Sequence, residues 1–159
     1  MRSIEYREGD LFEQTDLDAL AHGCNTQGLM GAGIARTFRA EYPEMFQQYV
    51  VQCGAKRAKP GGLFLWKDPW ASTKLRGAPK YVFNLFTQEK PGRNAKLEYL
   101  YPAFSDMYQA ASWLGVKSIG LPEIGCGIGG LEWDDVEGIL SNYDTLFPTI
   151  KTVVVRYKP

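Results

Sequence analysis

Two glycine-rich segments, Gly28–Ala35 and Gly125–Leu131, have the composition expected of loops that bind phosphate. Each follows a short apolar run and precedes a helical pattern. A strand that turns into a helix through glycines exposes backbone N–H groups and a helix N-terminus, and both attract anions. Two such turns in one small domain predict a ligand with two phosphates, or with one phosphate and an adjacent sugar.

The spacing of these glycines differs from two common nucleotide-binding motifs. Neither segment reads GxGxxG, and no Gly-Lys-Ser/Thr follows, so the Rossmann fingerprint and the P-loop are both unmatched. The second segment has four glycines within positions 125–130, although each glycine costs conformational entropy on folding. Close approach of a ligand to the backbone would explain this density. A sharply bent junction between a strand and a helix is the alternative.

Two polar residues stand where they could contact the rest of such a ligand. Asn25 ends an apolar run ahead of the first glycine turn, and its amide can both donate to and accept from a sugar hydroxyl. Asp10 follows a strand pattern, and its carboxylate can accept from an exocyclic amine such as that of adenine. For both residues the alternative is an ordinary turn or capping role.

His22 is the only histidine and the only side chain that titrates near neutral pH without perturbation. It is therefore a candidate acid or base. It precedes Asn25 by three residues, so a regular strand directs the two side chains to opposite faces. Burial in the core is the alternative role for His22.

Composition limits the function further. Eighteen basic and 18 acidic residues cancel, so no overall field favours nucleic acid or an anionic membrane. The longest apolar runs are strand-sized, the N-terminus lacks the apolar core of a signal peptide, and three cysteines without a CxxC pair indicate neither zinc nor disulfides. We expect a cytoplasmic protein that uses no metal or cofactor. Nothing in the sequence requires more than a monomer.

Strand and helix patterns alternate along residues 1–159, which predicts a single α/β domain whose ligands bind at the carboxyl ends of its strands. A proline at position 102 should break or kink the third helix unless the helix begins there. The stretch from Pro69 to Pro79 is typical of a surface connection. We expect strands over residues 4–8, 18–24, 61–66, 81–86, 116–122 and 149–157, and helices over 31–40, 43–52, 95–114 and 133–143.

Taken together, these motifs resemble those of macrodomains, the fold that binds ADP-ribose. The resemblance rests on Gly9-Asp10-Leu11, on Asn25 ahead of Met30–Ala35, and on Leu121–Trp133, and it covers the whole chain. It implies a three-layer α/β/α fold around a central mixed, mostly parallel sheet. It also implies that Asp10 holds adenine, that Asn25 faces the distal ribose, and that the two glycine turns grip the diphosphate and that ribose. The implied ligand-binding residues are Asp10, Leu11, Asn25, Met30, Gly31, Ala32, Gly33, Ile34, Ala35, Thr87, Gln88, Ile124, Gly125, Cys126, Gly127, Ile128, Gly129, Gly130 and Leu131.

The glycine motifs look like those of the subclass that contains the terminal ADP-ribose protein glycohydrolase and the DNA ADP-ribosyl glycohydrolase antitoxins. Catalytic members of that subclass have a lysine where this chain has Gln88. The protein glycohydrolase has an aspartate where this chain has Gly129, whereas the antitoxins have a glycine there. Lys90 could supply an amine from a shifted position, or be an ordinary solvated lysine. The segment from His22 to Asn25 is similar to that of yeast-type ADP-ribose 1''-phosphate phosphatases. The catalytic candidates are Asn25, Gln88, Lys90 and His22.

The resemblance implies an ADP-ribose-binding hydrolase that removes ADP-ribose from modified macromolecules or processes a derivative such as the 1''-phosphate or an O-acetyl ester. A non-catalytic ADP-ribose reader is the alternative that the replacement of the lysine by Gln88 favours. An antitoxin that reverses DNA ADP-ribosylation is a third. In each case nucleic acid enters only as a modified substrate, and no membrane partner is expected.

Overall fold

The computed structural model describes residues 4–71 and 79–158, which form a six-stranded sheet in the order β1-β6-β5-β2-β4-β3. Neighbouring strands are parallel except for β3, which pairs antiparallel with β4. The sheet is therefore mixed and mostly parallel, as predicted. The strands are β1 Glu5–Gly9, β2 Ala19–Asn25, β3 Leu63–Lys67, β4 Tyr81–Gln88, β5 Ser118–Leu121 and β6 Lys151–Tyr157.

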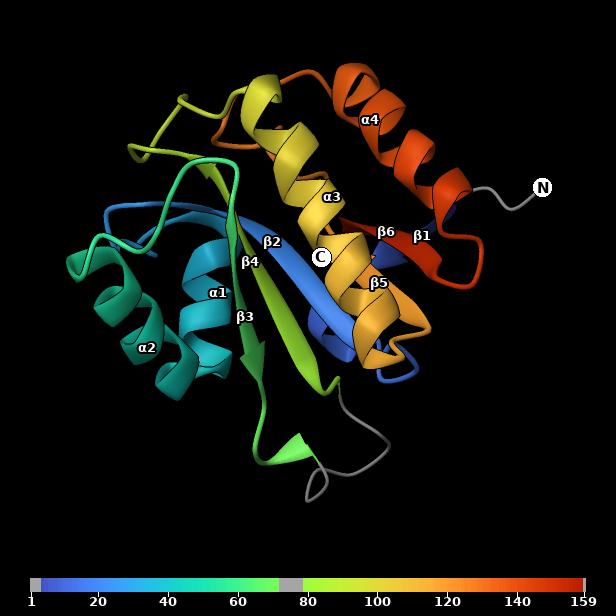
Figure 1. Ribbon diagram of the computed structural model, residues 1–159, viewed down its shortest axis with the longest axis horizontal. Helices are drawn as coiled ribbons and strands as arrows, with labels where there is room; N and C mark the ends of the chain where they lie inside the picture. The colour runs from blue at the N-terminus through green and yellow to red at the C-terminus, as the bar shows by residue number, and fades with distance from the viewer. Residues whose placement is uncertain (1–3, 72–78, 159) are drawn as a thin grey trace.

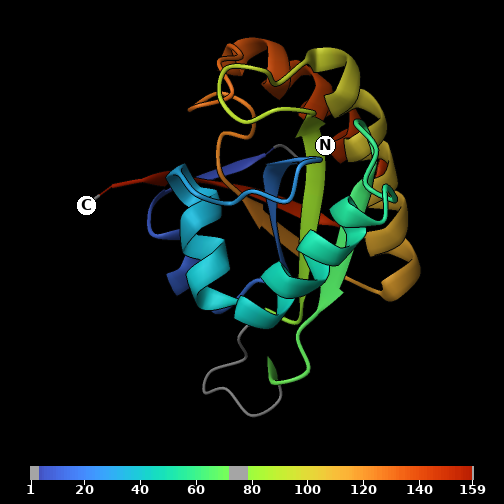
Figure 2. The same ribbon diagram turned by 90° about the vertical axis from the view of Figure 1, so that its left-hand side faces the viewer.

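Helices cover both faces of this sheet, so the predicted three-layer α/β/α architecture is confirmed (Figures 1 and 2). On one face lie α1 and α2, which are cyan and teal in the figures, and on the other lie α3 and α4, which are yellow to red. A short 3-10 helix, η1, follows β1. The helices are α1 Gly33–Glu41, α2 Pro43–Gly54, α3 Leu97–Leu114 and α4 Trp133–Leu146, and η1 is Leu11–Glu13.

The central strands explain why the chain folds this way. In β2, six of seven residues are buried because helices cover both faces of the strand, so its sequence is apolar without alternation. In β1, at the sheet edge, half-buried and exposed residues alternate. Two separate apolar clusters result, one between the sheet and α3 with α4, the other between the sheet and α1 with α2.

Pro102 lies inside α3, and the helix continues through it, so the predicted break is wrong. The proline stands in the second turn of the helix, and its ring packs toward Gly61, where an added Cβ would lie 2.9 Å from its Cγ. At its other end α3 stops at Gly115, whose φ of 74° is left-handed and suits glycine. Most of the predicted surface connection from Pro69 to Pro79 lies outside the described residues.

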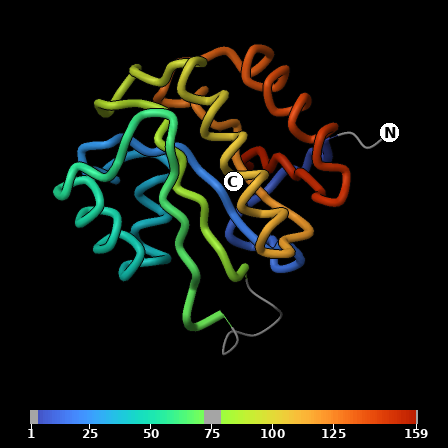
Figure 3. Tube along the Cα trace, viewed as in Figure 1, coloured from blue at the N-terminus to red at the C-terminus, as the bar shows by residue number. Residues whose placement is uncertain are grey.

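The loops after β2, β4 and β5 leave the same end of the sheet because these strands are parallel (Figure 3). The pairing of β2 with β4 shifts register after Cys24, so that Asn25 stands beside Gln88. This irregularity brings two of the predicted site residues together. None of the described helices has the length and hydropathy of a membrane span.

Candidate functional site

A cleft of about 1100 Å³ lies at this end of the sheet. Residues from five of the six strand ends line it, and the first two turns of α1 contribute as well. It includes most of the residues predicted to bind ligand, namely Asp10, Leu11, Asn25, Met30, Gly31, Ala32, Gly33, Ile34, Ala35, Thr87, Gln88, Ile124, Gly125, Cys126, Gly127, Ile128 and Gly129.

The first glycine turn presents the start of α1 to the cleft. Ala32 is the N-cap of this helix and offers no side-chain acceptor, so the first N–H groups of the helix remain open. Gly33 has a φ of 61°, which favours glycine. Gly31 differs, because its φ is not positive and a Cβ there would meet no atom within 4 Å. The fold does not require a glycine at position 31.

The second glycine turn separates into glycines that the fold needs and one that it does not. Gly125 and Gly130 have positive φ, and a Cβ on Gly129 would lie 2.6 Å from the Gly125 carbonyl oxygen. Gly127 has neither constraint, and it is exposed in the cleft. The bent junction therefore explains three of the four glycines. Close approach of a ligand to the backbone is the remaining explanation for a glycine at position 127.

Backbone donors in the second turn are also unused. The N–H groups of residues 127–130 donate to no other described residue, whereas Leu131 N–H donates to the Gly125 carbonyl at 2.8 Å. The helix α4 begins only at Trp133 and does not line the cleft. Anion binding at this turn would therefore come from the loop itself rather than from a helix end.

The two glycine turns approach each other across the cleft. A Cβ added at Gly33 would lie 3.0 Å from Cδ1 of Ile128, which is itself 50% exposed. An apolar side chain from the second turn thus lies over the start of α1. Together the two turns line one cavity.

Asn25 is buried and lines the cleft, but its amide is largely used within its own turn. Its Oδ1 accepts from Gln27 N–H at 3.0 Å, from Leu29 N–H at 3.3 Å and from the Tyr49 hydroxyl at 3.0 Å. Its Nδ2 donates to the Leu29 carbonyl at 2.8 Å. The amide retains one N–H, so Asn25 can donate one hydrogen bond to a ligand while it holds the turn.

Like Asn25, Gln88 lines the cleft and also forms hydrogen bonds within its own loop. Its Nε2 donates to the carbonyls of Lys90 and Gly92 at 2.6 and 2.9 Å, so it shapes the loop after β4. Pro91 and Gly92 line the cleft with it, whereas Lys90 is exposed and lies outside the lining. The Gln88 side chain thus holds the loop after β4 in place.

Asp10 caps η1, because its Oδ1 accepts from Phe12 N–H at 2.8 Å. Its second carboxylate oxygen has no hydrogen-bond partner in the part of the chain that the structure describes. The capping alternative is therefore realised, and one acceptor remains at the cleft for a donor such as an amine.

The structure places His22 in the core rather than in the cleft. Its ring is fully buried, stacks on Phe38 with ring centres 3.8 Å apart, and its Nε2 lies 2.6 Å from Oδ1 of Asn84. Burial lowers the pKa of His22 to about 4, against a smaller opposing effect of the Asn84 hydrogen bond. The ring is neutral at pH 7 and cannot reach a ligand, which removes it from the catalytic candidates.

Gly130 and Leu131 also lie outside the lining. Gly130 packs under the Arg93 side chain, and Leu131 packs against Gly125 and the adjoining apolar cluster. Cys126 does line the cleft, and burial, with nearby carboxylates, raises its pKa to about 11. It is therefore a neutral thiol at pH 7 rather than a nucleophile.

Sequence reasoning missed the contribution of β6. Val155, Arg156 and Tyr157 line the cleft, and Tyr157 is 78% exposed, which leaves its ring free to stack on a base. Arg156 lies over the Tyr6 ring and pairs with Glu123 at 3.5 Å. An aromatic residue at the end of the last strand was the available signal, but only the sheet order shows that β6 lies beside β1.

The fold and this cleft define a class: three-layer α/β/α proteins in which two backbone-lined turns face a single cavity at the carboxyl ends of parallel strands. The macro domain profile matches residues 21–140, and the chain belongs to the macrodomain family. No group of three or more metal-ligating side chains occurs within residues 4–71 and 79–158.

Two kinds of characterised relatives are similar to it. The DNA ADP-ribosyl glycohydrolase of Mycobacterium tuberculosis is 32% identical over 151 residues, which are 95% of this chain and 41% of that protein. The ADP-ribose 1''-phosphate phosphatase of Meyerozyma guilliermondii is 29% identical over 171 residues, 92% of this chain and 97% of that protein. The chain thus spans about two-fifths of the glycohydrolase and nearly all of the phosphatase.

Solved structures agree with this assignment. The macrodomain of Mycobacterium tuberculosis DarG superposes with a TM-score of 0.86 at 32% identity, over 99% of this chain and 98% of that one. Thermosipho africanus DarTG in complex with ADP-ribose gives a TM-score of 0.83 over 97% of this chain and 42% of that one. At 22% identity, this second likeness extends to the fold alone.

Proposed function

We propose that the cleft binds ADP-ribose and that the protein hydrolyses an ADP-ribose conjugate. The observation that carries this proposal is the pair of glycine turns that line one cleft with backbone N–H groups free of hydrogen bonds to other described residues. The fold does not require a glycine at position 31 or 127, because a Cβ at either position would meet no atom within 4 Å. Such donors suit a diphosphate. A relative solved with ADP-ribose bound shares the fold.

The sheet order gives the ligand a direction. Asp10 follows β1 and Asn25 ends β2, and these strands are three spacings apart, roughly 14 Å. The second glycine turn follows β5, which lies between them. A base at Asp10 and Tyr157, a diphosphate between the turns and a second sugar at Asn25 and Gln88 would fill the cleft in that order.

The chemistry at the distal end is then one of positioning. Asn25 and Gln88 are neutral amides, so neither can act as a nucleophile or titrate near pH 7. Binding of the adenosine and diphosphate would instead hold the reacting carbon of the distal ribose next to a water oriented by amide groups and ribose hydroxyls. Hydrolysis would break the bond between that ribose and its leaving group.

A non-catalytic reader is the second candidate, and the hydrogen bonds of Gln88 favour it. The residue at the position of the subclass lysine is committed to the 90–92 loop, and Lys90 lies outside the cleft. A reader would bind ADP-ribose and leave every conjugate intact.

The relatives suggest two kinds of substrate for the enzyme. One is named as acting on ADP-ribosylated DNA and the other on ADP-ribose 1''-phosphate, which makes an antitoxin role against DNA modification a third possibility. The balanced net charge gives no general attraction to DNA, so DNA would be recognised through its ADP-ribose.

Calorimetry and a turnover panel test these proposals together. ADP-ribose should bind the purified protein with measurable heat, and ADP-ribosylated DNA, ADP-ribosylated protein, ADP-ribose 1''-phosphate and O-acetyl-ADP-ribose should be compared as substrates. Turnover of any one supports the enzyme. Binding without turnover supports the reader, and absence of binding overturns both.

A further inference from the structure

The two edges of the sheet differ in chemistry. The β1 edge is charged: Arg7 pairs with Glu5 and with Asp16 at 2.9 Å, and Lys158 pairs with Glu8 at 2.9 Å. Charged edges discourage pairing with another strand. The β3 edge reads Leu-Phe-Leu-Trp-Lys, is half-buried over its first four residues, and has a single charge at its end. Lys67 is thus the one charged residue of β3, and no other strand of the described sheet pairs with this edge.

The hydrogen bonds between β3 and β4 show which backbone N–H and C=O groups of β3 point to the outer edge of the sheet. Phe86 N–H donates to the Gly62 carbonyl at 2.9 Å, and Asp68 N–H donates to the Lys80 carbonyl at 2.8 Å. Because bonded pairs alternate in antiparallel strands, residues 64 and 66 bond to β4. The N–H and C=O groups of residues 63, 65 and 67 therefore point to the free edge.

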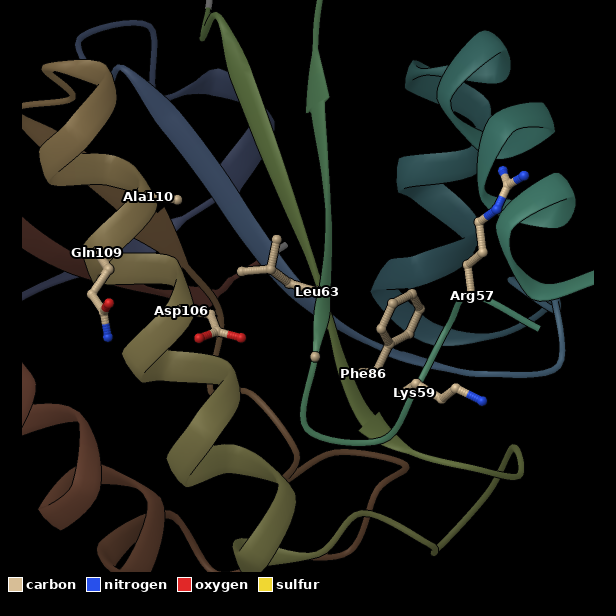
Figure 4. Close-up of a pocket in the computed structure, with 8 residues that line it drawn as sticks. Arg57, Lys59, Leu63, Phe86, Asp106, Gln109 and Ala110 are labelled. Carbon is tan, nitrogen blue, oxygen red and sulfur yellow. The ribbon is translucent and has the colours of Figure 1, made fainter. Parts of the chain in front are cut away.

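A cavity of about 430 Å³ opens beside the start of this edge (Figure 4). Leu63 lies at its centre, Asp106 and Gln109 of α3 lie on one side, and Arg57 and Lys59 lie on the other. Asp106 is exposed and has no ion-pair partner among the residues that the structure describes. On the α3 side of the cavity an incoming strand would meet this carboxylate, whereas the basic side chains of Arg57 and Lys59 lie on the opposite side.

We propose that a second copy of this chain pairs with the β3 edge, antiparallel about a two-fold axis at Leu65. In this register Leu65 faces its own symmetry mate and Leu63 faces the Lys67 position of the other copy. All the outward groups of both strands are then used, in about six hydrogen bonds. A shift of the axis by one residue would use fewer of them.

The side chains are complementary in the same register. Leu63 and Leu65 pack toward α3, and the alternation of the strand puts Lys67 on that face too. The ammonium group of one copy is thus brought to the cavity that holds Asp106 of the other. On the opposite face, Phe64 and Trp66 stand across from each other, and such aromatic cross-strand pairs are stabilising.

The face of α3 that carries Asp106 also exposes an aromatic side chain. Trp113 is 90% exposed and stands seven residues after Asp106, which places both on one face of α3. An unrelated extended peptide would gain the backbone bonds but would have no reason to carry a lysine in this register. The self-complementary charge favours the second copy.

Sedimentation and light scattering over a concentration series test the proposal. We expect the mass to rise from 17.9 kDa to twice that value. Lys67→Glu and Asp106→Lys should each reduce dimerisation about tenfold, and the double variant should recover it. Glu98→Lys, the same charge change in the first turn of α3, is the matched control. A protein that stays monomeric up to millimolar concentration overturns the proposal.

Cross-linking tests the register. Leu65→Cys should form a disulfide-linked dimer under oxidation, because bonded pairs stand about 5.5 Å apart at Cα. Leu63→Cys should not, since its mate is displaced along the strand. A dimer that resists charge reversal and cross-links equally well at both positions refutes the interface. The cavity beside β3 shares no lining residue with the ligand cleft, so ADP-ribose titration of the same variants reports separately on the proposed function.

Discussion

Alanine at Gly31 or Gly127 should separate ligand binding from folding. Neither residue has a positive φ, and a Cβ at either position meets no atom within 4 Å. Replacing such a glycine lowers the entropy of the unfolded chain, so the free energy of unfolding of each variant should exceed that of the parent by about 0.4–1 kcal/mol. The fold should tolerate both changes.

The same methyl group should weaken the binding of ADP-ribose. It projects from a backbone that we propose to contact phosphate, and it would hold the ligand away from the N–H groups beside it. One lost hydrogen bond to a charged group costs about 1.5–3 kcal/mol, which corresponds to roughly a 10- to 150-fold rise in Kd. Calorimetric titration measures this, and urea unfolding of the same samples measures stability.

Gly138→Ala is the matched control for this pair. Gly138 is exposed in the interior of α4, its Cβ would also meet nothing within 4 Å, and it is remote from the cleft lining. It should gain about 1 kcal/mol of stability from helix propensity with unchanged affinity. If Gly31→Ala and Gly127→Ala bind ADP-ribose as tightly as the parent, the reasoning that assigns these glycines to the ligand is refuted.

Three further outcomes follow from the packing around the cleft. Because burial lowers the pKa of His22 to about 4 from an unfolded value near 6.5, the free energy of unfolding should fall by up to about 3 kcal/mol as the pH drops from 6.5 to 4. His22→Gln should reduce this pH dependence of the urea unfolding midpoint. A dependence equal to that of the parent would contradict the prediction. Gly129→Asp should lose about 1–3 kcal/mol in thermal unfolding, since its Cβ would lie 2.6 Å from a carbonyl oxygen, and a variant of parental stability would show that the turn can relax. Gln88→Ala removes two hydrogen bonds to the 90–92 loop and should increase amide hydrogen exchange there while β4 stays protected, whereas unchanged exchange would deny Gln88 a positioning role.

The sequence predicted the elements because each carries its own signal. The continuous apolar run of β2 reflects burial on both faces. The apolar residues of α3 recur at helical spacing, and the helix forms along them in spite of Pro102. The glycine turns were visible for the same reason, since their composition is local. These features needed no knowledge of which strand lies beside which.

What the sequence could not show depends on contacts between distant segments. The stacking of His22 on Phe38 joins β2 to α1, and the place of Tyr157 in the cleft depends on β6 lying beside β1. The register shift that sets Asn25 beside Gln88 is likewise a property of paired strands. The position of β3 at the edge of the sheet also became visible only with the sheet order, whereas the sequence required nothing beyond a monomer.

The hydrogen bonds of the cleft also bear on how selectivity could arise. Asn25 uses most of its hydrogen-bonding groups within its own turn, and Gln88 uses both of its N–H groups in its own loop. The donors left for a ligand are then mainly backbone N–H groups, which recognise phosphate and carry no information about a leaving group. Discrimination among conjugates must then come from the rim, where the 88–95 loop is tied to the second turn by a bond from Ala95 N–H to the Gly129 carbonyl at 3.3 Å. That loop carries Lys90 and Arg93. Under the proposed hydrolase function, exchanging the loop for the same segment of a relative should change which conjugate is hydrolysed and leave the affinity for free ADP-ribose unaltered.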